Sequence, residues 1–228
     1  NFCLWCLFSL GIYKIDKANK NLFNVDRVCN RVFFYKILYI YDLIDIFISP
    51  SQFLKNKVEE MGFRGKIVYL PYFVNIQEYQ PQYDWDRDET SIVYFGRLSH
   101  EKGLFPLIKS MKGILNVTLK IIGEGSLRKS LESAVRNLEL KNIVFLGYRS
   151  GDNLKNEIKK GMFVVVPSEW YENYPFVAIE SFALGKPVVG SRIGGIPELV
   201  KDGITGLTFE PGNVEDLKAK IEYMLNNP

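Results

Sequence analysis

From Ser91 onward, short apolar runs alternate with longer segments whose apolar residues recur at helical spacing. The apolar runs predict strands over 91–98, 117–123, 143–148, 162–167 and 187–191. The intervening segments predict helices over 104–114, 126–138, 152–160, 175–184 and 214–225. Strands that alternate with helices form right-handed βαβ units, so the predicted fold class is α/β with a doubly wound parallel sheet. The runs VTLKIIG and MFVVVPS are apolar enough for interior strands that are covered on both faces.

The region before Ser91 has a different pattern. IFISP at 46–50 predicts a short strand, a Ser-capped helix follows over 52–61, and KIVYLPYFVN predicts a strand that leads into a turn. The polar stretch 77–90 reads as a linker or long surface loop. We therefore expect part of a first domain over 1–76, a linker over 77–90 and a second domain over 91–228.

Composition and charge exclude several classes of protein. The 228 residues are 47% hydrophobic and 24% charged, which fits a globular chain and neither a disordered nor a fibrous one. A net charge of +3, with lysines spread along the chain, does not indicate a nucleic-acid partner. The most apolar run, 31–49, is interrupted by Lys36, Asp42 and Asp45, which favours a buried helix and strand over a bilayer span. The aromatic, basic stretch 31–41 also fits peripheral membrane contact, and a core helix explains it equally well.

The cysteines favour a reducing, cytoplasmic setting. Cys3, Cys6 and Cys29 are an odd number, and no secretory leader is evident. Cys3 and Cys6 have the spacing of metal ligands, but the single histidine, His100, is far away, so buried or loop thiols are expected and no metal site. The chain begins with Asn1 in an apolar stretch, and we expect that an upstream part is missing.

Two glutamates stand out in the stretch SEWYENYPFVAIESFALGKPVVGSRIGG, which begins at Ser168. Pro175 is predicted to open a helix through Leu184, because proline is well tolerated at a first helical position. Glu172 then lies in the loop before the helix. Glu180 falls among apolar residues, where a carboxylate is hard to bury without partners. We therefore expect Glu180 to hold a ligand.

Two cations follow the first strand of the second domain. Ile92 to Phe95 runs into Gly96 and Arg97, and Lys102 precedes a predicted helix. In parallel sheets, anions bind at the carboxyl ends of strands and at helix N-termini. Arg97 offers a bidentate fork and Lys102 a point charge, which together suit a diphosphate and would make a divalent metal unnecessary.

These motifs occur in a specific order: G-R-L-x-x-E-K-G from Gly96, G-E-G from Gly123 to Gly125, and E-x7-E from Glu172. The order resembles the C-terminal, donor-binding half of GT-B glycosyltransferases, specifically the retaining group called family 4, over about residues 45 to 227. The resemblance implies transfer of a sugar from a nucleoside diphosphate sugar, the donor substrate, to a sugar or lipid-linked acceptor. It also implies polysaccharide or lipopolysaccharide synthesis at the inner face of the membrane, without a cofactor.

The expected roles of the residues follow from this resemblance and from their chemistry. Arg97, Lys102 and Glu172 are expected to be catalytic, with Glu172 binding the transferred sugar, and Glu180 is expected to accept from the two ribose hydroxyls. Tyr148 is expected to stack on the base. Further donor contacts are expected from backbone at strand ends and at the helix start: Gly96, Gly123, Gly125, Tyr174, Pro175, Phe176 and Val177. Gly194 and Gly195 are expected to be mainly structural.

Several alternatives stay open on the sequence alone. The D-x-D triplet from Asp84 to Asp86 is typical of metal and diphosphate sites in another glycosyltransferase fold, but it lies in the predicted linker with no strand before it. His100 is expected to face solvent. No histidine matches the acceptor-side histidine of the family, so the chain could bind donor without transferring it. A sugar-nucleotide epimerase of the same fold is a further alternative.

Overall fold

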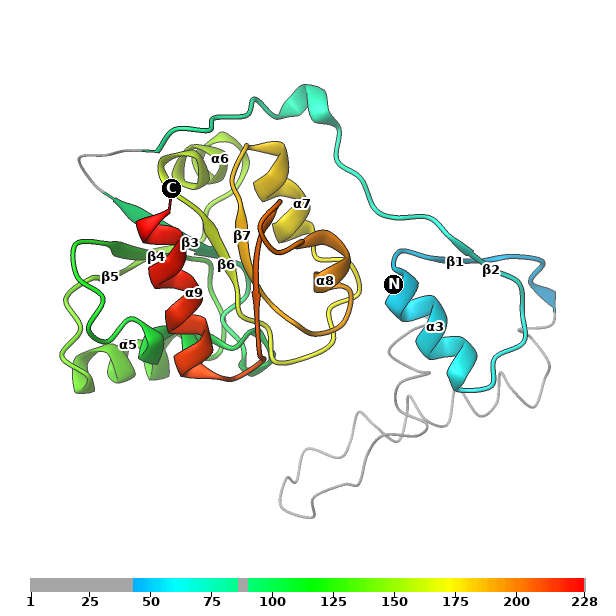
Figure 1. Cartoon of the computed structure of the whole chain (residues 1–228), viewed down its shortest axis with the longest axis horizontal. Helices are drawn as coiled ribbons and strands as arrows, with labels where there is room; N and C mark the ends of the chain where they lie inside the picture. The colour runs from blue at the N-terminus through cyan, green and yellow to red at the C-terminus, as the bar shows by residue number, and fades with distance from the viewer. Residues whose placement is uncertain (1–42, 86–89, 228) are drawn as a thin grey trace, which may run out of the picture. The chain divides into compact units, whose positions relative to one another are not determined.

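The computed structural model describes residues 43–85 and 90–227 (Figure 1). It divides the chain into two compact units, Asn1–Leu70 and Pro71–Pro228. The predicted linker, 77–90, therefore lies wholly after the division. The predictions for Cys3, Cys6, Cys29 and the 31–41 stretch fall outside the described residues, and so does Asp86.

The described part of the first unit is a strand, a helix and a strand. Strand β1 (Phe47–Ser49) pairs in parallel with β2 (Ile67–Tyr69), and helix α3 (Gln52–Glu60) connects them. The Ser51 side chain caps the helix by accepting from the Leu54 N–H. Leu54 and Val58 are its buried residues, one helical turn apart. The predicted order of elements is confirmed here.

The second unit contains a six-stranded parallel sheet in the order β5-β4-β3-β6-β7-β8. Its strands, in chain order, are β3 (Ser91–Phe95), β4 (Thr118–Ile122), β5 (Ile143–Gly147), β6 (Val164–Val166), β7 (Val188–Ser191) and β8 (Gly206–Phe209). Strand β3, the first of this sheet in the sequence, lies between β4 and β6. The sheet continues through β4 and β5 on one side of β3 and through β6, β7 and β8 on the other. Such a reversal point is where doubly wound sheets bind ligands.

Two helical layers cover this sheet. The helices are α4 (Leu104–Ser110), α5 (Arg128–Asn137), α6 (Gly151–Lys160), α7 (Phe176–Ala183), α8 (Ile196–Leu199) and α9 (Val214–Asn226). Ile92 and Tyr94 of β3 belong to one core cluster with α4, α5 and α9, whereas Val93 and Phe95 belong to another with α6, α7 and α8. Because successive strand residues point to opposite faces, β3 is buried on both sides. The predicted doubly wound α/β class is confirmed.

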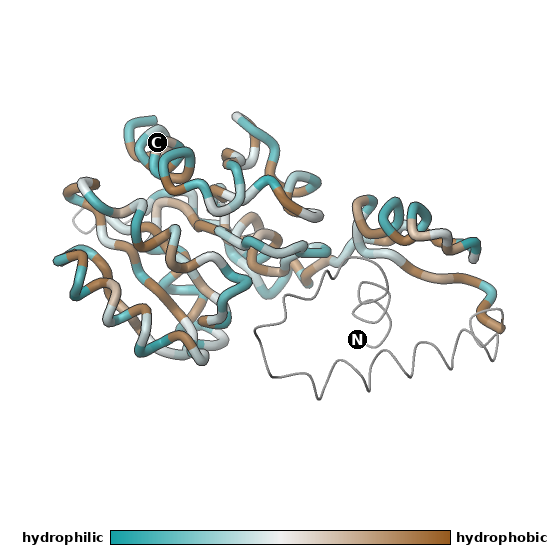
Figure 2. Tube along the Cα trace, turned by 90° about the horizontal axis from the view of Figure 1, so that it is seen from below, coloured by the Kyte–Doolittle hydropathy of each residue, from teal (hydrophilic) through white to brown (hydrophobic). Residues whose placement is uncertain are grey.

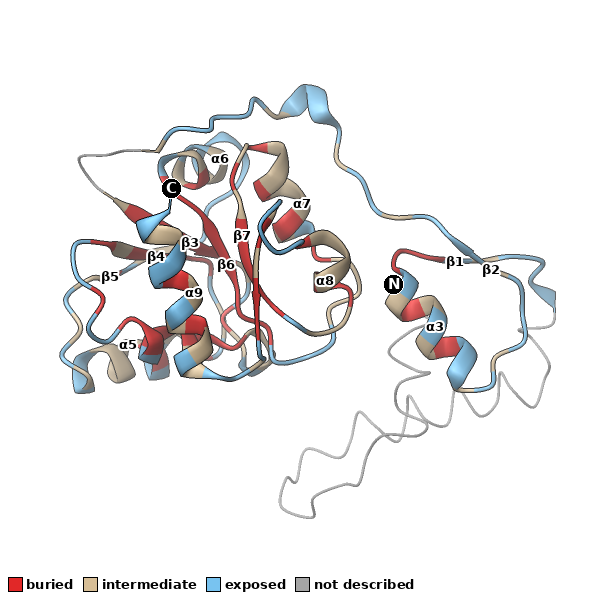
Figure 3. Cartoon of the chain, viewed as in Figure 1, coloured by how far each residue is buried: buried red, intermediate tan, exposed pale blue. Residues whose placement is uncertain are grey.

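Burial and hydropathy follow the same layers. Figure 3 shows the strands of the sheet as largely buried and the outer sides of the helices as exposed. Figure 2 shows hydrophilic and hydrophobic residues alternating along the helical turns, as expected for helices that bury one face. No helix in 43–85 or 90–227 is long and apolar enough to cross a membrane.

The five strands and five helices predicted from Ser91 onward are present. Most have shorter ends, but α6 begins one residue earlier and α9 ends one residue later than predicted. The helix predicted over 104–114 ends at Ser110, and the strand predicted over 91–98 ends at Phe95. The sequence analysis missed the edge strand β8. Its residues, GLTF, begin with a glycine and follow a turn-rich segment, so they lack the apolar run that marked the other strands; the strand pairs with β7 from Val188–Gly206 to Ser191–Phe209.

Residues 71–85, which we call the strap, run along α7. The Tyr72 ring stacks on Phe176 at the start of the helix, with 5.0 Å between centroids. The Gln82 N–H donates to the Leu184 carbonyl at its end, over 2.9 Å. The strap is mostly exposed, but Trp85 packs against the core.

Candidate functional site

The predicted site residues come from loops that leave β3 and β6 at their carboxyl ends. Gly96 and Arg97 directly follow β3, and Lys102 ends a short 3₁₀-helix, His100–Lys102. Glu172 lies in the loop between β6 and α7. These strands are neighbours at the reversal point of the sheet, so the fold brings both loops to one edge.

A cavity of about 500 Å³ opens at this edge. Five predicted donor-binding residues are among those that line it: Gly96, Arg97, Gly123, Tyr148 and Glu180. Phe95, Ile122 and Leu154 supply apolar walls, while Glu124 and Arg149 supply charge. An apolar pocket with a few polar groups is the usual form of a small-molecule site.

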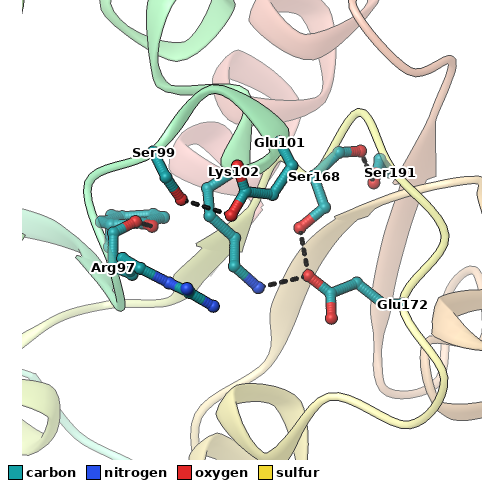
Figure 4. A network of polar contacts seen from close by, with 8 residues as sticks. Arg97, Ser99, Glu101, Lys102, Ser168, Glu172 and Ser191 are labelled. Carbon is teal, nitrogen blue, oxygen red and sulfur yellow. Dashed lines mark hydrogen bonds and ion pairs between the residues drawn. The ribbon is translucent and has the colours of Figure 1, made fainter. Parts of the chain in front are cut away.

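Lys102 and Glu172 form an ion pair beside the cavity. The Lys102 ammonium donates to Glu172 Oε1, and Ser168 Oγ donates to the same oxygen over 2.8 Å. Ser191 Oγ donates in turn to the Ser168 carbonyl over 2.6 Å. Figure 4 shows Arg97 and Lys102 extending their charged ends toward the Glu172 carboxylate. The sequence analysis gave no role to Ser168, although it begins the stretch that carries Glu172.

The remaining predicted contacts are not among the lining residues of this cavity. They are Lys102, Gly125, Glu172, Tyr174, Pro175, Phe176 and Val177. Pro175 is the N-cap of α7, which therefore begins one residue later than predicted. Phe176 is half-exposed under the Tyr72 ring, and Tyr174 meets that ring edge-on at 6.3 Å.

The G-x-G turn holds two loops together. A Cβ at Gly123 would lie 2.0 Å from the Gly96 carbonyl oxygen, and one at Gly125 would lie 2.3 Å from the Leu98 carbonyl oxygen. Hydrogen bonds join the same loops, from Gly96 N to Ile122 O and from Leu98 N to Glu124 O, both over 3.0 Å. These glycines allow backbone to approach backbone, and a contact of Gly123 or Gly125 with donor stays a prediction.

Gly194 and Gly195 perform the same task for the Glu172 loop. A Cβ at Gly195 would lie 1.8 Å from the Asn173 carbonyl oxygen, and one at Gly194 would lie 2.4 Å from that of Glu172. The Gly195 N–H donates to the Glu172 carbonyl over 2.6 Å. The loop before α8 thus fixes the backbone that carries Glu172, a structural role.

Charged and phenolic groups near the cations have displaced pKa values. Burial opposes ionisation of Glu101, but the Ser99 hydroxyl, which donates over 2.6 Å, and the Arg97 and Lys102 charges leave the Glu101 pKa lowered. Burial, with Glu172 and Glu101 nearby, raises the pKa of Tyr94. Tyr94 therefore keeps the proton that it donates to the Arg97 carbonyl over 2.8 Å.

Other candidates from the sequence take no part in this cluster. The Asp84 carbonyl accepts from the Lys186 ammonium over 2.7 Å, and His100 is exposed, as predicted. Within 43–85 and 90–227, no three histidine, cysteine or acidic residues are grouped to hold a metal ion.

Comparison with known proteins decides the family. The family model described as "Glycosyl transferases group 1" matches residues 75–228, more than half of the chain. The chain belongs to the group 1 glycosyl transferases. The match covers the six-stranded sheet and every site residue predicted from the sequence.

The relatives of this group 1 chain include both uncharacterized and named enzymes. It is 34% identical to an uncharacterized glycosyltransferase of Methanocaldococcus jannaschii over 183 residues, 80% of the chain and 50% of the relative. It is 31% identical to the lipopolysaccharide 1,2-N-acetylglucosaminetransferase of Salmonella typhimurium over 179 residues, 70% of the chain and 47% of the relative. The chain thus spans about half the length of these relatives.

Solved structures share the fold. Sucrose-phosphate synthase from Thermosynechococcus elongatus has a TM-score of 0.75 at 27% identity, over 81% of this chain and 50% of that one. Anabaena HepE in complex with UDP and glucose has a TM-score of 0.71 at 23% identity, over 80% and 54%. These likenesses support the GT-B fold of the group 1 chain, whose second unit is the Rossmann-like C-terminal domain.

Proposed function

We propose that this chain is the donor-binding half of a retaining, metal-independent glycosyltransferase of family 4. It takes a sugar from a nucleoside diphosphate sugar and passes it to a sugar or lipid-linked acceptor. One observation carries the proposal: at the reversal point of the sheet, Arg97 and Glu180 line a cavity of about 500 Å³, and the neighbouring loops carry the Lys102–Glu172 ion pair.

The cations suit the leaving diphosphate. As the bond to the sugar breaks, negative charge grows on the diphosphate oxygens. The positive charges of Arg97 and Lys102 would stabilise it. The Phe176 and Val177 N–H groups precede the first hydrogen bond of α7, which runs from Ala178 N to the Pro175 carbonyl, and they add positive partial charge. Removing one such preorganised donor typically costs about 2.7–4 kcal/mol of transition-state stabilisation.

The carboxylates suit the two sugars of the donor. Glu180 faces the cavity, where it would accept from the ribose hydroxyls, and Tyr148 at the rim would stack on the base. Glu172 would accept from hydroxyls of the transferred sugar and stabilise its cationic transition state. The ion pair supports this role, because it joins the Glu172 carboxylate to Lys102, the cation that would bind the diphosphate.

The similar proteins fit this reaction. One solved neighbour is in complex with UDP-glucose, and one relative is a lipopolysaccharide transferase. We therefore propose a role in polysaccharide or lipopolysaccharide synthesis, in the cytoplasm at the inner face of the membrane. The 31–41 stretch would supply the peripheral membrane contact.

Donor binding is tested first, with the chain as it stands. A thermal-shift screen against UDP-, GDP- and ADP-sugars should give a raised melting temperature with at least one of them. Arg97→Ala should weaken binding of that donor about tenfold or more in calorimetry, and Arg136→Ala, at an exposed arginine on α5, should not. Absence of any shift, or equal binding by Arg97→Ala and the parent, would contradict the proposal.

Transfer is tested with the intact enzyme that carries this donor-binding half, in the presence of a sugar acceptor. Nuclear magnetic resonance of the product should show the anomeric configuration of the donor, and EDTA should not reduce the rate. Binding without turnover would instead support a nucleotide-sugar-binding protein. Turnover of the donor without an acceptor product would support an epimerase.

A further inference from the structure

The strap meets the cavity wall at Tyr79. Its hydroxyl donates to Glu180 Oε1 over 3.0 Å, although the two residues are 101 positions apart in the sequence. The ring packs against the core cluster that contains Ala178 and Leu184 of the α7 region. Glu180 lines the cavity, whereas Tyr79 is not among the lining residues. Tyr79 therefore contacts the cavity wall through its hydrogen bond to Glu180.

The local structure holds Tyr79 in place. Residues Ile76–Glu78 form a short 3₁₀-helix, whose N-cap Asn75 accepts from the Gln77 N–H and donates to the Glu78 carboxylate over 3.0 Å. Tyr79 is the C-cap, with extended backbone that directs the chain onward along α7. The turn therefore sets where the tyrosine side chain leaves the strap.

Helix α6 also contacts Tyr79, through Lys155. The Lys155 ammonium lies 4.6 Å from the centre of the Tyr79 ring and donates to the Glu78 carbonyl over 2.7 Å. Tyr79 thus contacts two helices, with its ring against Lys155 of α6 and its hydroxyl bonded to Glu180 of α7. Helix α6 also supplies Gly151 and Leu154 to the cavity wall. Tyr79 therefore connects the two helices, α6 and α7, that contribute to this wall.

The hydrogen bond fixes how the carboxylate is presented. A carboxylate has two oxygens and about four acceptor sites, so Glu180 keeps capacity for a ligand while one oxygen is held by Tyr79. Burial and the Glu180 charge raise the pKa of Tyr79 to about 12. The phenol therefore stays protonated at neutral pH and acts as the donor.

We propose that Tyr79 is a positioning residue, which orients the Glu180 carboxylate to accept from both hydroxyls of a ribose. This inference rests on the proposed function, in which Glu180 binds the ribose of a nucleoside diphosphate. A freely rotating glutamate would lose side-chain entropy on binding a diol, whereas a glutamate that is already held loses less. Tyr79 would thus favour ribonucleotides without touching them.

The test compares a ribose with a sugar that lacks both hydroxyls. UDP, GDP and ADP, each with its 2′,3′-dideoxy counterpart, are titrated by calorimetry into the chain and into Tyr79→Phe. The variant keeps the ring under Lys155 and removes only the hydroxyl. We expect the preference for the best-bound ribonucleotide over its dideoxy form to fall about tenfold, with the dideoxy affinity unchanged. The melting temperature should fall only by the small amount that the loss of one hydrogen bond causes.

Two controls separate positioning from folding. Tyr83→Phe alters another tyrosine of the strap, 78% exposed, and should leave the preference intact. In a Glu180→Gln background the Tyr79→Phe change should have no further effect on the preference, because the oriented carboxylate is already gone.

Each outcome bears on a different proposal. If the parent chain binds ribose and dideoxy forms equally, the ribose role of Glu180 in the proposed function is wrong. If the parent prefers ribose and Tyr79→Phe keeps the full preference, the positioning inference is overturned. An equal loss for both nucleotides would also overturn it, since Tyr79 would then act only by holding the strap.

Discussion

Lys102 and Glu172 form an ion pair across the neighbouring loops that follow β3 and β6, although 70 positions separate them in the sequence. Their side chains are only 25% and 20% exposed, so the pair is partly buried, and removing one partner would leave the other charge without its counterion. The significance of the pair is chemical. The ammonium that would bind diphosphate is already held by the carboxylate that would bind the transferred sugar.

Neutralising Glu172 should therefore strengthen nucleotide binding and slow sugar transfer. In Glu172→Gln, Lys102 no longer faces a competing carboxylate, and we expect UDP or GDP to bind about three- to tenfold more tightly in calorimetry. Sugar transfer should fall at least a hundredfold, because the cationic transition state loses its partner. The exposed neighbour Glu169→Gln is the matched control and should change neither. Weaker nucleotide binding by Glu172→Gln would show that the pair does not compete with the diphosphate.

Gly195 should be needed for the donor site as well as for stability. An added Cβ would overlap the Asn173 carbonyl and displace the loop that carries Glu172, so Gly195→Ala should unfold about 1–3 kcal/mol more easily and bind donor less tightly. Gly203→Ala meets no atom within 4 Å and suffers only from its positive φ of +75°, which costs roughly 1–2 kcal/mol. Urea unfolding and calorimetry should show both variants destabilised, but only Gly195→Ala impaired in binding.

Tyr94 should hold the backbone of Arg97 in place. Tyr94→Phe removes the hydroxyl that donates to the Arg97 carbonyl, and we expect unfolding to become easier by about 0.5–1.5 kcal/mol. The loosened loop should also weaken nucleoside diphosphate binding a few-fold. Tyr223→Phe, an exposed tyrosine on α9, is the reference variant. Unchanged stability in Tyr94→Phe would mean that this hydrogen bond is replaced by water at no cost.

Lys186 should make stability depend on alkaline pH. The side chain is 1% exposed, and burial lowers its pKa to about 8, against the opposing effect of Asp84. Between about pH 8 and the ordinary lysine pKa of about 10.4, the unfolded chain therefore binds more protons than the native chain at this residue, so its contribution to stability rises with pH.

The measurement compares Lys186→Met with the parent by urea unfolding at pH 7.5, 9 and 10.5. The difference in unfolding free energy, parent minus variant, should increase across this range. Lys112→Met, at an exposed lysine, gives the reference difference. A difference for Lys186→Met that stays constant with pH would show that the buried amine keeps an ordinary pKa in the native state.

Local pattern was enough to predict the main elements of the second unit. Periodicity of two or of 3.6 residues depends only on neighbours in the sequence, so the strands before Gly96 and after Met162 and the helix after Pro175 could be predicted. Charged residues at the ends of apolar strands also pointed to one edge of a parallel sheet. Strand β8 could not be found this way, because GLTF follows a glycine-containing turn segment and is not a continuous apolar run like VVV of β6.

What the amino-acid sequence alone determined, then, is the α/β class and the chemical types gathered near strand ends. Tertiary structure decided which of these groups face one another. It paired Lys102 with Glu172, brought Tyr79 of the strap to Glu180, and set the glycines of two loops against neighbouring carbonyls. Such contacts join residues that are tens of positions apart, and no local periodicity records them. They follow from strand order and packing, which only the folded chain contains.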